Sequence, residues 1–193
     1  MKTSFTITLS VVFLALAFAA CSAPPVEDMQ KAQDAVIRAE SDADAVAYAG
    51  NSIVRARDAL TRMQNEAEAK RYDAAKNYAA EAISNAEQAI SDGRAGASRA
   101  MDDAANLINS LSGPLAETAG ALNAARSVEG IQLDFNSLAR DLSTAQSTYD
   151  EAWQSFNADN YRDAIDKGQA VRSMLADINA RITDAAIVTS RKQ

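Results

Sequence analysis

The stretch LARDLSTAQSTYDEAWQSFNADNYRDAIDKGQAVRSMLADINARI, residues 138–182, decides the fold that we expect for this chain. Its apolar residues recur every three or four positions, the spacing of one face of an α-helix. The polar residues Asn157-Ala158-Asp159-Asn160 separate two such stripes and predict a turn, and short connections make successive helices antiparallel neighbours. The stretch therefore predicts a helical hairpin. Its stripes are Leu138, Leu142, Ala145, Tyr149, Ala152 and Phe156, then Tyr161, Ile165, Gly168, Val171, Leu175, Ile178 and Ile182.

The same helical spacing occurs earlier in the chain. Three stripes are separated by breaks at Gly50-Asn51-Ser52 and near Arg71-Tyr72-Asp73, and the third is expected to end at Asp92-Gly93. A shift of 89 residues overlays the earlier hairpin on the later one, as expected either from a duplication or from two amphipathic hairpins of equal length. The three stripes are Met29, Ala32, Val36, Ala39, Ala43 and Val46; Ile53, Ala56, Leu60, Met63 and Ala67; and Ala75, Ala79, Ala82, Ile83, Ala86 and Ile90.

The middle of the chain is less regular. A helix over residues 98–111 is expected to end at Gly113-Pro114, because proline removes a helical hydrogen bond. A second helix is expected from about residue 115 to 128, and an extended connector at residues 131–133. The fold class is therefore all-α, an elongated set of antiparallel hairpins or a bundle with alanine-rich, heptad-like seams. We expect one helical hairpin domain at 26–96, and a second region at 97–193 that either packs on it or forms its own subdomain.

The N-terminus predicts export. Residues 1–20 have one charge, Lys2, then an apolar run that is too short to span a bilayer, as in a secretory signal peptide. The run ends Phe18-Ala19-Ala20-Cys21, which resembles a bacterial lipobox, in which cleavage between Ala20 and Cys21 follows lipidation of the cysteine. Residues 21–25 would then be the lipidated cysteine and a tether. The alternative is an ordinary secretory signal with Cys21 as an accidental thiol, but the chain has one cysteine and thus no disulfide partner for it.

The lipobox resemblance also implies a location. In proteobacterial sorting an aspartate after the cysteine retains a lipoprotein at the inner membrane, so Ser22 points to the periplasmic leaflet of the outer membrane of a Gram-negative bacterium. The membrane contact would be the N-acyl and S-diacylglycerol lipid on Cys21, and we expect no other cofactor. Two or more acyl chains together hold a protein stably at a membrane.

Composition narrows the possible chemistry. The chain has no histidine, which removes Ser-His-Asp triads, Cys-His pairs and histidine metal sites. Without residues 1–20, 18 basic residues face 26 acidic ones, a net charge of −8, so we expect no nucleic-acid partner. No small-molecule substrate is evident either. We expect a protein without catalytic residues.

Two groups of residues remain as candidate sites. The pairs Asp42/Asp44 and Asp159/Asp163 are the best calcium-like groupings. The run from Asn157 lacks the glycine and the glutamate of an EF-hand loop, and Asp42 and Asp44 point to different faces of a predicted helix. Both pairs are therefore interpreted as capping or solvated residues, and no metal is expected. Tyr149, Trp153, Phe156 and Tyr161 form an aromatic cluster at the hairpin turn. Its members Trp153, Tyr149 and Tyr161 are a possible interaction surface for stacking on sugar or peptide, and the alternative, which we favour, is packing at the hairpin end.

A family resemblance rests on Tyr48-Ala-Gly-Asn-Ser-Ile-Val-Arg-Ala-Arg-Asp-Ala-Leu, continued by Ala69-Lys-Arg-Tyr-Asp-Ala-Ala-Lys and Ala79-Ala-Glu-Ala-Ile. These motifs, over about residues 26–96, resemble the alanine-rich helical domain of unknown function of many Gram-negative lipoproteins. The family has no established activity, so the resemblance implies fold and location only.

Three functions follow as hypotheses. The first is a structural or protein-interaction scaffold of the cell envelope, with an envelope protein as partner. The second is an adaptor similar to tetratricopeptide repeats, an α-solenoid that binds a peptide or protein, although the signature residues of those repeats are absent. The third, a carboxylate-based hydrolase, needs a cleft with paired acids, which a narrow alanine-seamed bundle does not favour.

Overall fold

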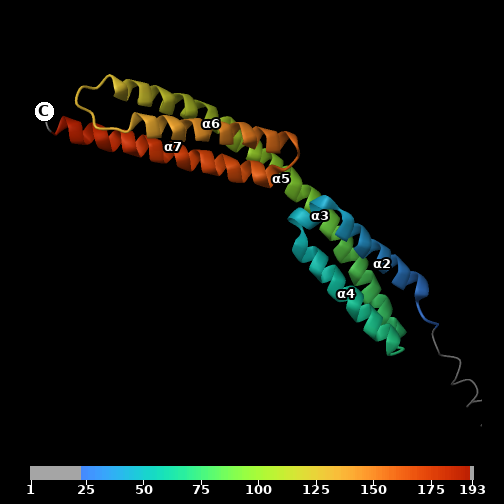
Figure 1. Ribbon diagram of the computed structural model, residues 1–193. Helices are drawn as coiled ribbons and strands as arrows, with labels where there is room; N and C mark the ends of the chain where they lie inside the picture. Colours follow the sequence, from blue (N-terminus) through green and yellow to red (C-terminus); the bar gives the residue numbers. More distant parts are fainter. Residues whose placement is uncertain (1–22, 192–193) are drawn as a thin grey trace, which may run out of the picture. The chain divides into compact units, whose positions relative to one another are not determined.

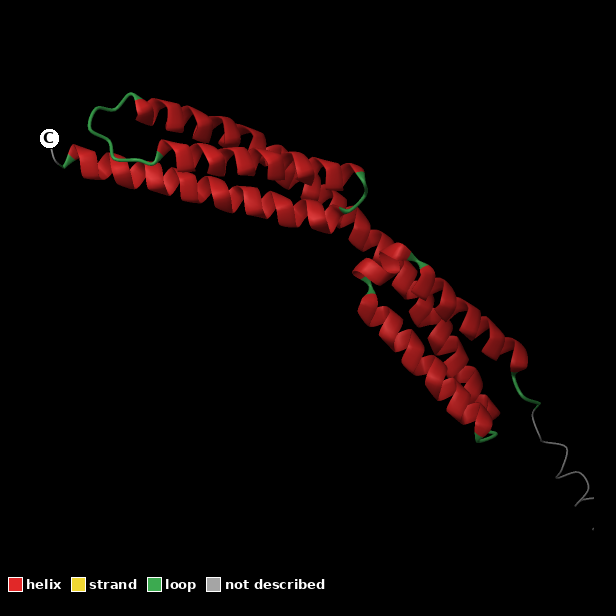
Figure 2. Cartoon of the chain, viewed as in Figure 1, coloured by secondary structure: helices red, strands yellow, loops and turns green. Residues whose placement is uncertain are grey.

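The computed structural model describes residues 23–191. The predicted signal peptide at 1–20, the predicted cleavage site and the predicted lipidation at Cys21 lie outside the described residues. Within that range every regular element is an α-helix, so the all-α prediction is confirmed (Figures 1 and 2). The helices are α2 (Val26–Ser41), α3 (Ala43–Tyr48), α4 (Gly50–Glu68), α5 (Tyr72–Arg126), α6 (Phe135–Asn157) and α7 (Tyr161–Ser190).

The packing divides the chain into two units. The first ends at Arg94 and contains α2, α3, α4 and the first part of α5. The second begins at Ala95 and contains the rest of α5 with α6 and α7. Each unit is therefore a set of neighbouring helices around a core of its own.

Alanine dominates the core of the first unit, where α2, α4 and the first part of α5 lie side by side (Figure 1). Twelve of its fifteen buried residues are alanine, so the helix axes can approach closely. Each methyl group buries little apolar area, at roughly 25 cal/mol per Å². The larger buried side chains Val36, Ile53 and Met63 therefore contribute most per residue.

The chain between α2 and α4 differs from the prediction. One helix was expected to run to Gly50 with Ala43 and Val46 on its buried stripe, and this is wrong. The Asp42 carboxylate instead accepts a hydrogen bond from the Ala45 backbone N–H (2.8 Å) and begins the short helix α3. This N-cap turns the helix, so Ala45 is fully buried and Val46 is 57% exposed.

The expected helix end at Asp92-Gly93 is also wrong, because α5 continues through both residues. Gly93 is buried, and a Cβ atom added there would lie 2.5 Å from the Ala45 backbone nitrogen. The glycine therefore permits close approach of α3 to α5 within the first unit. Helix propensity alone favours a break at this position, but the contact requires glycine for another reason.

Larger side chains fill the second unit. α6 and α7 form the antiparallel hairpin predicted from residues 138–182, and they pack against α5. The fully buried Thr118 hydroxyl on α5 accepts a hydrogen bond from the Asn179 amide on α7 (2.8 Å). Three layers of core follow one another along the hairpin. They contain Ala104, Ile108, Ala152 and Ala164; Leu111, Leu115, Ala145, Val171 and Leu175; and Leu122, Leu138 and Ile178.

The predicted break at Gly113-Pro114 does not occur, since α5 runs through Pro114. Both residues are exposed, whereas Leu111 and Leu115 on either side are buried. The buried stripe thus continues across the proline at helical spacing. Tertiary packing keeps the segment helical despite the hydrogen bond that proline cannot donate.

Candidate functional site

The aromatic residues selected from the sequence lie together at the α6–α7 turn. Trp153 contacts Tyr149 edge to face, with ring centroids 6.5 Å apart, and Phe156 in the same manner at 5.7 Å. Phe156 in turn contacts Tyr161 at 5.6 Å. All four rings are partly buried against the core layer of Ala104 and its neighbours.

This geometry favours packing, rather than stacking on a ligand, as the role of the aromatic cluster. Edge-to-face contacts between rings contribute about 0.5–1.5 kcal/mol each beyond the area they bury. The Tyr161 hydroxyl also donates a hydrogen bond to Asp159 in the turn (2.7 Å). The cluster therefore ties the turn to both helices, and its rings have fewer free faces for stacking on a sugar or peptide.

A polar cluster lies beside the rings. The Ser155 hydroxyl on α6 donates a hydrogen bond to the Asp163 carboxylate on α7, and the Lys167 ammonium donates to both groups, with 3.2 Å to the serine oxygen. Hydrogen bonds from Lys167 and then from Ser155 hold the pKa of Asp163 below its usual value. Both Ser155 and Lys167 thus make their contacts with the Asp163 carboxylate, which joins α6 to α7. The cluster therefore joins two helices and gives the hydrolase hypothesis no support.

Three of the four aspartates in the calcium-like pairs, Asp42, Asp159 and Asp163, have structural partners. Asp42 caps α3, and Asp159 accepts the hydrogen bond from Tyr161. Within residues 23–191, no group of three or more acidic or cysteine side chains is arranged to hold a metal ion. Over the same range no helix has the length and hydropathy of a membrane span.

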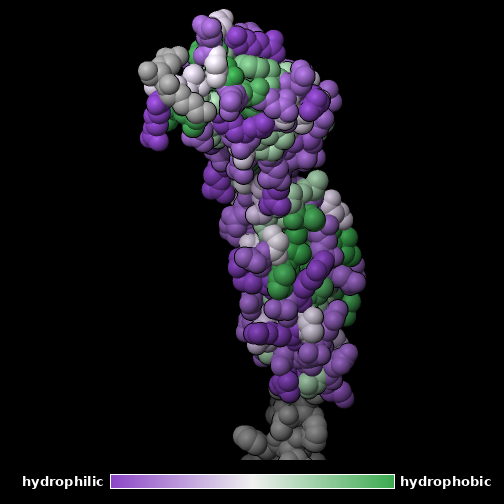
Figure 3. All heavy atoms as spheres, turned by 60° about the vertical axis from the view of Figure 1, so that its left-hand side comes forward, coloured by the Kyte–Doolittle hydropathy of each residue, from purple (hydrophilic) through white to green (hydrophobic). Residues whose placement is uncertain are grey.

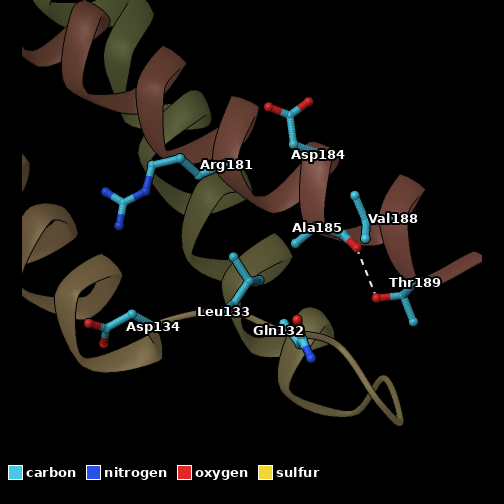
Figure 4. Close-up of a pocket in the computed structure, with 8 residues that line it drawn as sticks. All are labelled: Gln132, Leu133, Asp134, Arg181, Asp184, Ala185, Val188 and Thr189. Atoms are coloured by element: carbon cyan, nitrogen blue, oxygen red, sulfur yellow. Dashed lines mark hydrogen bonds between the residues drawn. The ribbon is translucent and has the colours of Figure 1, made fainter.

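Two open pockets on the second unit share one residue, Arg181. The larger, about 790 Å³, lies between α6 and α7, and the smaller, about 360 Å³, lies between the 132–134 connector and the end of α7 (Figure 4). We call the two together the Arg181 groove. The larger pocket is lined by Ser137, Asp141, Thr144, Ala170, Ser173, Met174, Asp177 and Arg181, and the smaller by Gln132, Leu133, Asp134, Arg181, Asp184, Ala185, Val188 and Thr189.

The positive charge of Arg181 is paired with aspartates of the groove itself. Its guanidinium donates a hydrogen bond to Asp141 (2.7 Å), lies 3.6 Å from Asp177, and donates a longer hydrogen bond to Ser137 (3.4 Å). The hydrogen bond to Asp141 raises the pKa of Arg181 above its usual value, so the side chain stays a cation. With four aspartates and one arginine, the lining is acidic.

Aliphatic side chains are also exposed. On the second unit Val188 and Ile187 near the end of α7 are 47% and 44% exposed. On the first unit Ile37 and Val54 are 52% and 51% exposed, one turn before Glu40 and Arg57, whose ion pair joins α2 to α4. Figure 3 shows such hydrophobic patches on a mostly hydrophilic surface.

Comparison with known proteins adds one match. No curated protein and no solved structure shows significant similarity to the chain. Residues 27–105 match a family model described as Domain of unknown function (DUF4398). The match begins at the second residue of α2 and ends within α5, so it covers all the helices of the first unit. The chain therefore contains a helical DUF4398 domain at residues 27–105.

Proposed function

We propose that this chain is a lipid-anchored periplasmic lipoprotein whose helical units act as a non-enzymatic scaffold that binds other components of the cell envelope. The alanine packing of the first unit is the observation that carries the scaffold role. Because most of the buried residues are alanine, several longer side chains of this unit lie outside the core, where another molecule can contact them. The exposed Ile37, Val46 and Val54 are of this kind.

The anchor is supported by the sequence. Cys21 is the one cysteine, Ala19 and Ala20 precede it, and Pro24-Pro25 leads directly into α2 at Val26. Ser22 supports the outer membrane as the location. The DUF4398 domain at 27–105 would then begin within a few residues of the lipid.

Metabolic labelling tests the anchor. Cells that express the Cys21→Ala variant with labelled palmitate should show no labelled protein, whereas the Ser22→Ala variant should be labelled like the parent. Undiminished labelling of the Cys21→Ala variant would refute lipidation. Density separation of the membranes tests the location, and Ser22→Asp should move the protein to the inner-membrane fraction.

Crosslinking tests the scaffold. A photoreactive amino acid at the exposed Val54, in intact cells, should give discrete adducts that mass spectrometry identifies as envelope proteins. The matched control places the same group at Lys76, an exposed polar position of α5 in the same unit. Adducts with bulk membrane proteins alone, equal at the two positions, would contradict a specific scaffold.

A peptide-binding adaptor is the second candidate, and the Arg181 groove favours it. The groove places apolar and charged side chains along one side of α6 and α7, as a binding site for an extended partner requires. Against an α-solenoid, each unit closes around its own core. Crosslinks confined to the groove would favour the adaptor, and crosslinks from both units the scaffold.

A further inference from the structure

We infer that the Arg181 groove binds a basic, amphipathic segment of a partner protein, one that combines lysine or arginine side chains with aliphatic ones. The proposal rests on the proposed interaction role and names the chemistry of its partner. It does not depend on the lipid at Cys21, so the two can fail separately.

The length of the groove suits a peptide segment. Its lining on α7 runs from Ala170 to Thr189, which at 1.5 Å per residue is roughly 28 Å of helix. An extended segment of about eight residues, or about five turns of helix, would cover this length. The facing wall comes from α6 between Ser137 and Thr144 and from the 132–134 connector.

The charges require a basic partner. Asp141 and Asp177 form ion pairs with Arg181, whereas no ion pair among the described residues involves the other two aspartates of the groove lining, Asp134 and Asp184. The Asp134 carboxylate accepts only the backbone N–H groups of Asn136 and Ser137, at the start of α6. In Figure 4 the Asp184 carboxylate points outward from α7, where it can meet a partner's cation.

The apolar residues of the groove require aliphatic side chains in the partner as well. In Figure 4 the Leu133 side chain lies between the connector and α7, beneath Ala185, with Val188 farther along the helix. Val188 is 47% exposed, and Met174 provides a partly buried apolar surface in the larger pocket. Aliphatic side chains of a partner would cover these groups. An acidic peptide or an anionic lipid surface would meet the uncompensated aspartates and be repelled.

The proposal is tested with two synthetic amphipathic peptides, one of leucine and lysine at helical spacing and a control with glutamate in place of lysine. The full chain, labelled with ¹⁵N, is titrated with each peptide while its backbone amides are followed by NMR. The lysine peptide should shift amides at residues 132–144 and 170–189, and the glutamate peptide should not. Shifts elsewhere, or equal shifts with both peptides, would overturn the proposal.

Charge variants sharpen the test. Asp134→Asn with Asp184→Asn should weaken binding of a fluorescent lysine peptide by about fivefold, and asparagine still caps α6. Asp150→Asn with Asp166→Asn is the matched control, because it removes the same charge from exposed positions of α6 and α7 outside the groove lining. Equal affinities of the two double variants would contradict the groove as the binding site.

Other occupants are separated in the same experiments. If the groove amides shifted when only the protein concentration was raised, the occupant would be a second copy of the chain. If they shifted with phospholipid vesicles but not with the lysine peptide, the occupant would be a membrane surface. Either result overturns the proposal. If the lysine peptide does not bind while in-cell crosslinks still identify envelope proteins, the scaffold function is supported and the assignment of the groove is refuted.

Discussion

Lys70 and Asp159, 89 residues apart, adopt the same left-handed backbone conformation, with φ angles of 57° and 58°. Each lies in the turn between two helices, two residues after the first helix ends. The following residues, Arg71 and Asn160, donate the same backbone hydrogen bond, to Glu66 and Ser155 respectively, both at 2.9 Å. This is the six-residue hydrogen bond of a Schellman motif. The two hairpins therefore share one turn geometry.

The shared register continues into the core. The helices after the two turns begin at Tyr72 and Tyr161, which are also 89 residues apart. Five buried positions of α5 match five buried positions of α7 at that offset. The pairs are Ala75 and Ala164, Ala79 and Gly168, Ala82 and Val171, Ala86 and Leu175, and Ala89 and Ile178. The chain thus builds the same hairpin twice, with mainly alanine in the first and larger residues in the second.

The first prediction concerns the turn at Lys70. A left-handed conformation costs a non-glycine residue about 1 kcal/mol, so Lys70→Gly should raise the free energy of unfolding by about that amount. Urea unfolding followed by circular dichroism measures the change. Lys76→Gly, at an exposed interior position of α5, should lower the same quantity by about 1 kcal/mol. A destabilised Lys70→Gly variant would contradict the turn geometry.

The second prediction concerns the contact between Gly93 and Ala45. The Cβ of a Gly93→Ala variant would lie 2.5 Å from the Ala45 backbone nitrogen, so α3 must move, at a cost of about 1–3 kcal/mol in unfolding free energy. Gly120→Ala is the matched control, because nothing lies within 4 Å of its added Cβ atom. That variant should gain about 0.5–1 kcal/mol from helix propensity. Equal effects of the two substitutions, measured by thermal unfolding, would rule out the close approach.

Regular periodicity made the helices predictable. The hairpin of α6 and α7, its turn at Asn157–Asn160 and most of its buried stripe followed from the spacing of apolar residues. The failures were the missed break before α3 and the two helix ends predicted at Asp92-Gly93 and Gly113-Pro114. Aspartate either caps a helix or lies in solvent, and glycine either ends a helix or admits a neighbour. Only the packing partner decides which use applies.

A candidate site could be predicted from the sequence only where its residues lie close together in the chain. The aromatic cluster was visible in the sequence because its four members lie close together in the chain, from Tyr149 to Tyr161. The Arg181 groove was missed because it joins residues 132–144 to residues 170–189, and that pairing depends on the register of α6 against α7. The spacing of Asp177, Arg181 and Asp184 on one helix face was the available signal.

The third prediction concerns Pro114. An alanine at this position supplies the missing backbone N–H within α5, and the exposed site leaves room for its side chain. Pro114→Ala should therefore raise the free energy of unfolding by about 1–3 kcal/mol. Gly113→Ala, at the neighbouring exposed position, should gain less, at about 0.5–1 kcal/mol. If Pro114→Ala lowered the melting temperature, proline would have to stabilise α5 in a manner that the packing does not explain.

The last prediction concerns the pH dependence that Asp163 gives the second unit. Lys167 and Ser155 hold the pKa of Asp163 below its ordinary value of 3.8, so the ionised form is favoured in the folded chain. Its contribution to stability is therefore full above that value and is lost as pH falls through the lower pKa of the folded state. The difference in unfolding free energy between the parent and Asp163→Asn should therefore become smaller as the pH falls from about 6 to about 2. Urea unfolding followed by fluorescence of Trp153, the one tryptophan, measures it. Asp166→Asn controls for the loss of one charge from α7, and a gap that stays constant for Asp163→Asn would refute the role of the Lys167 pair.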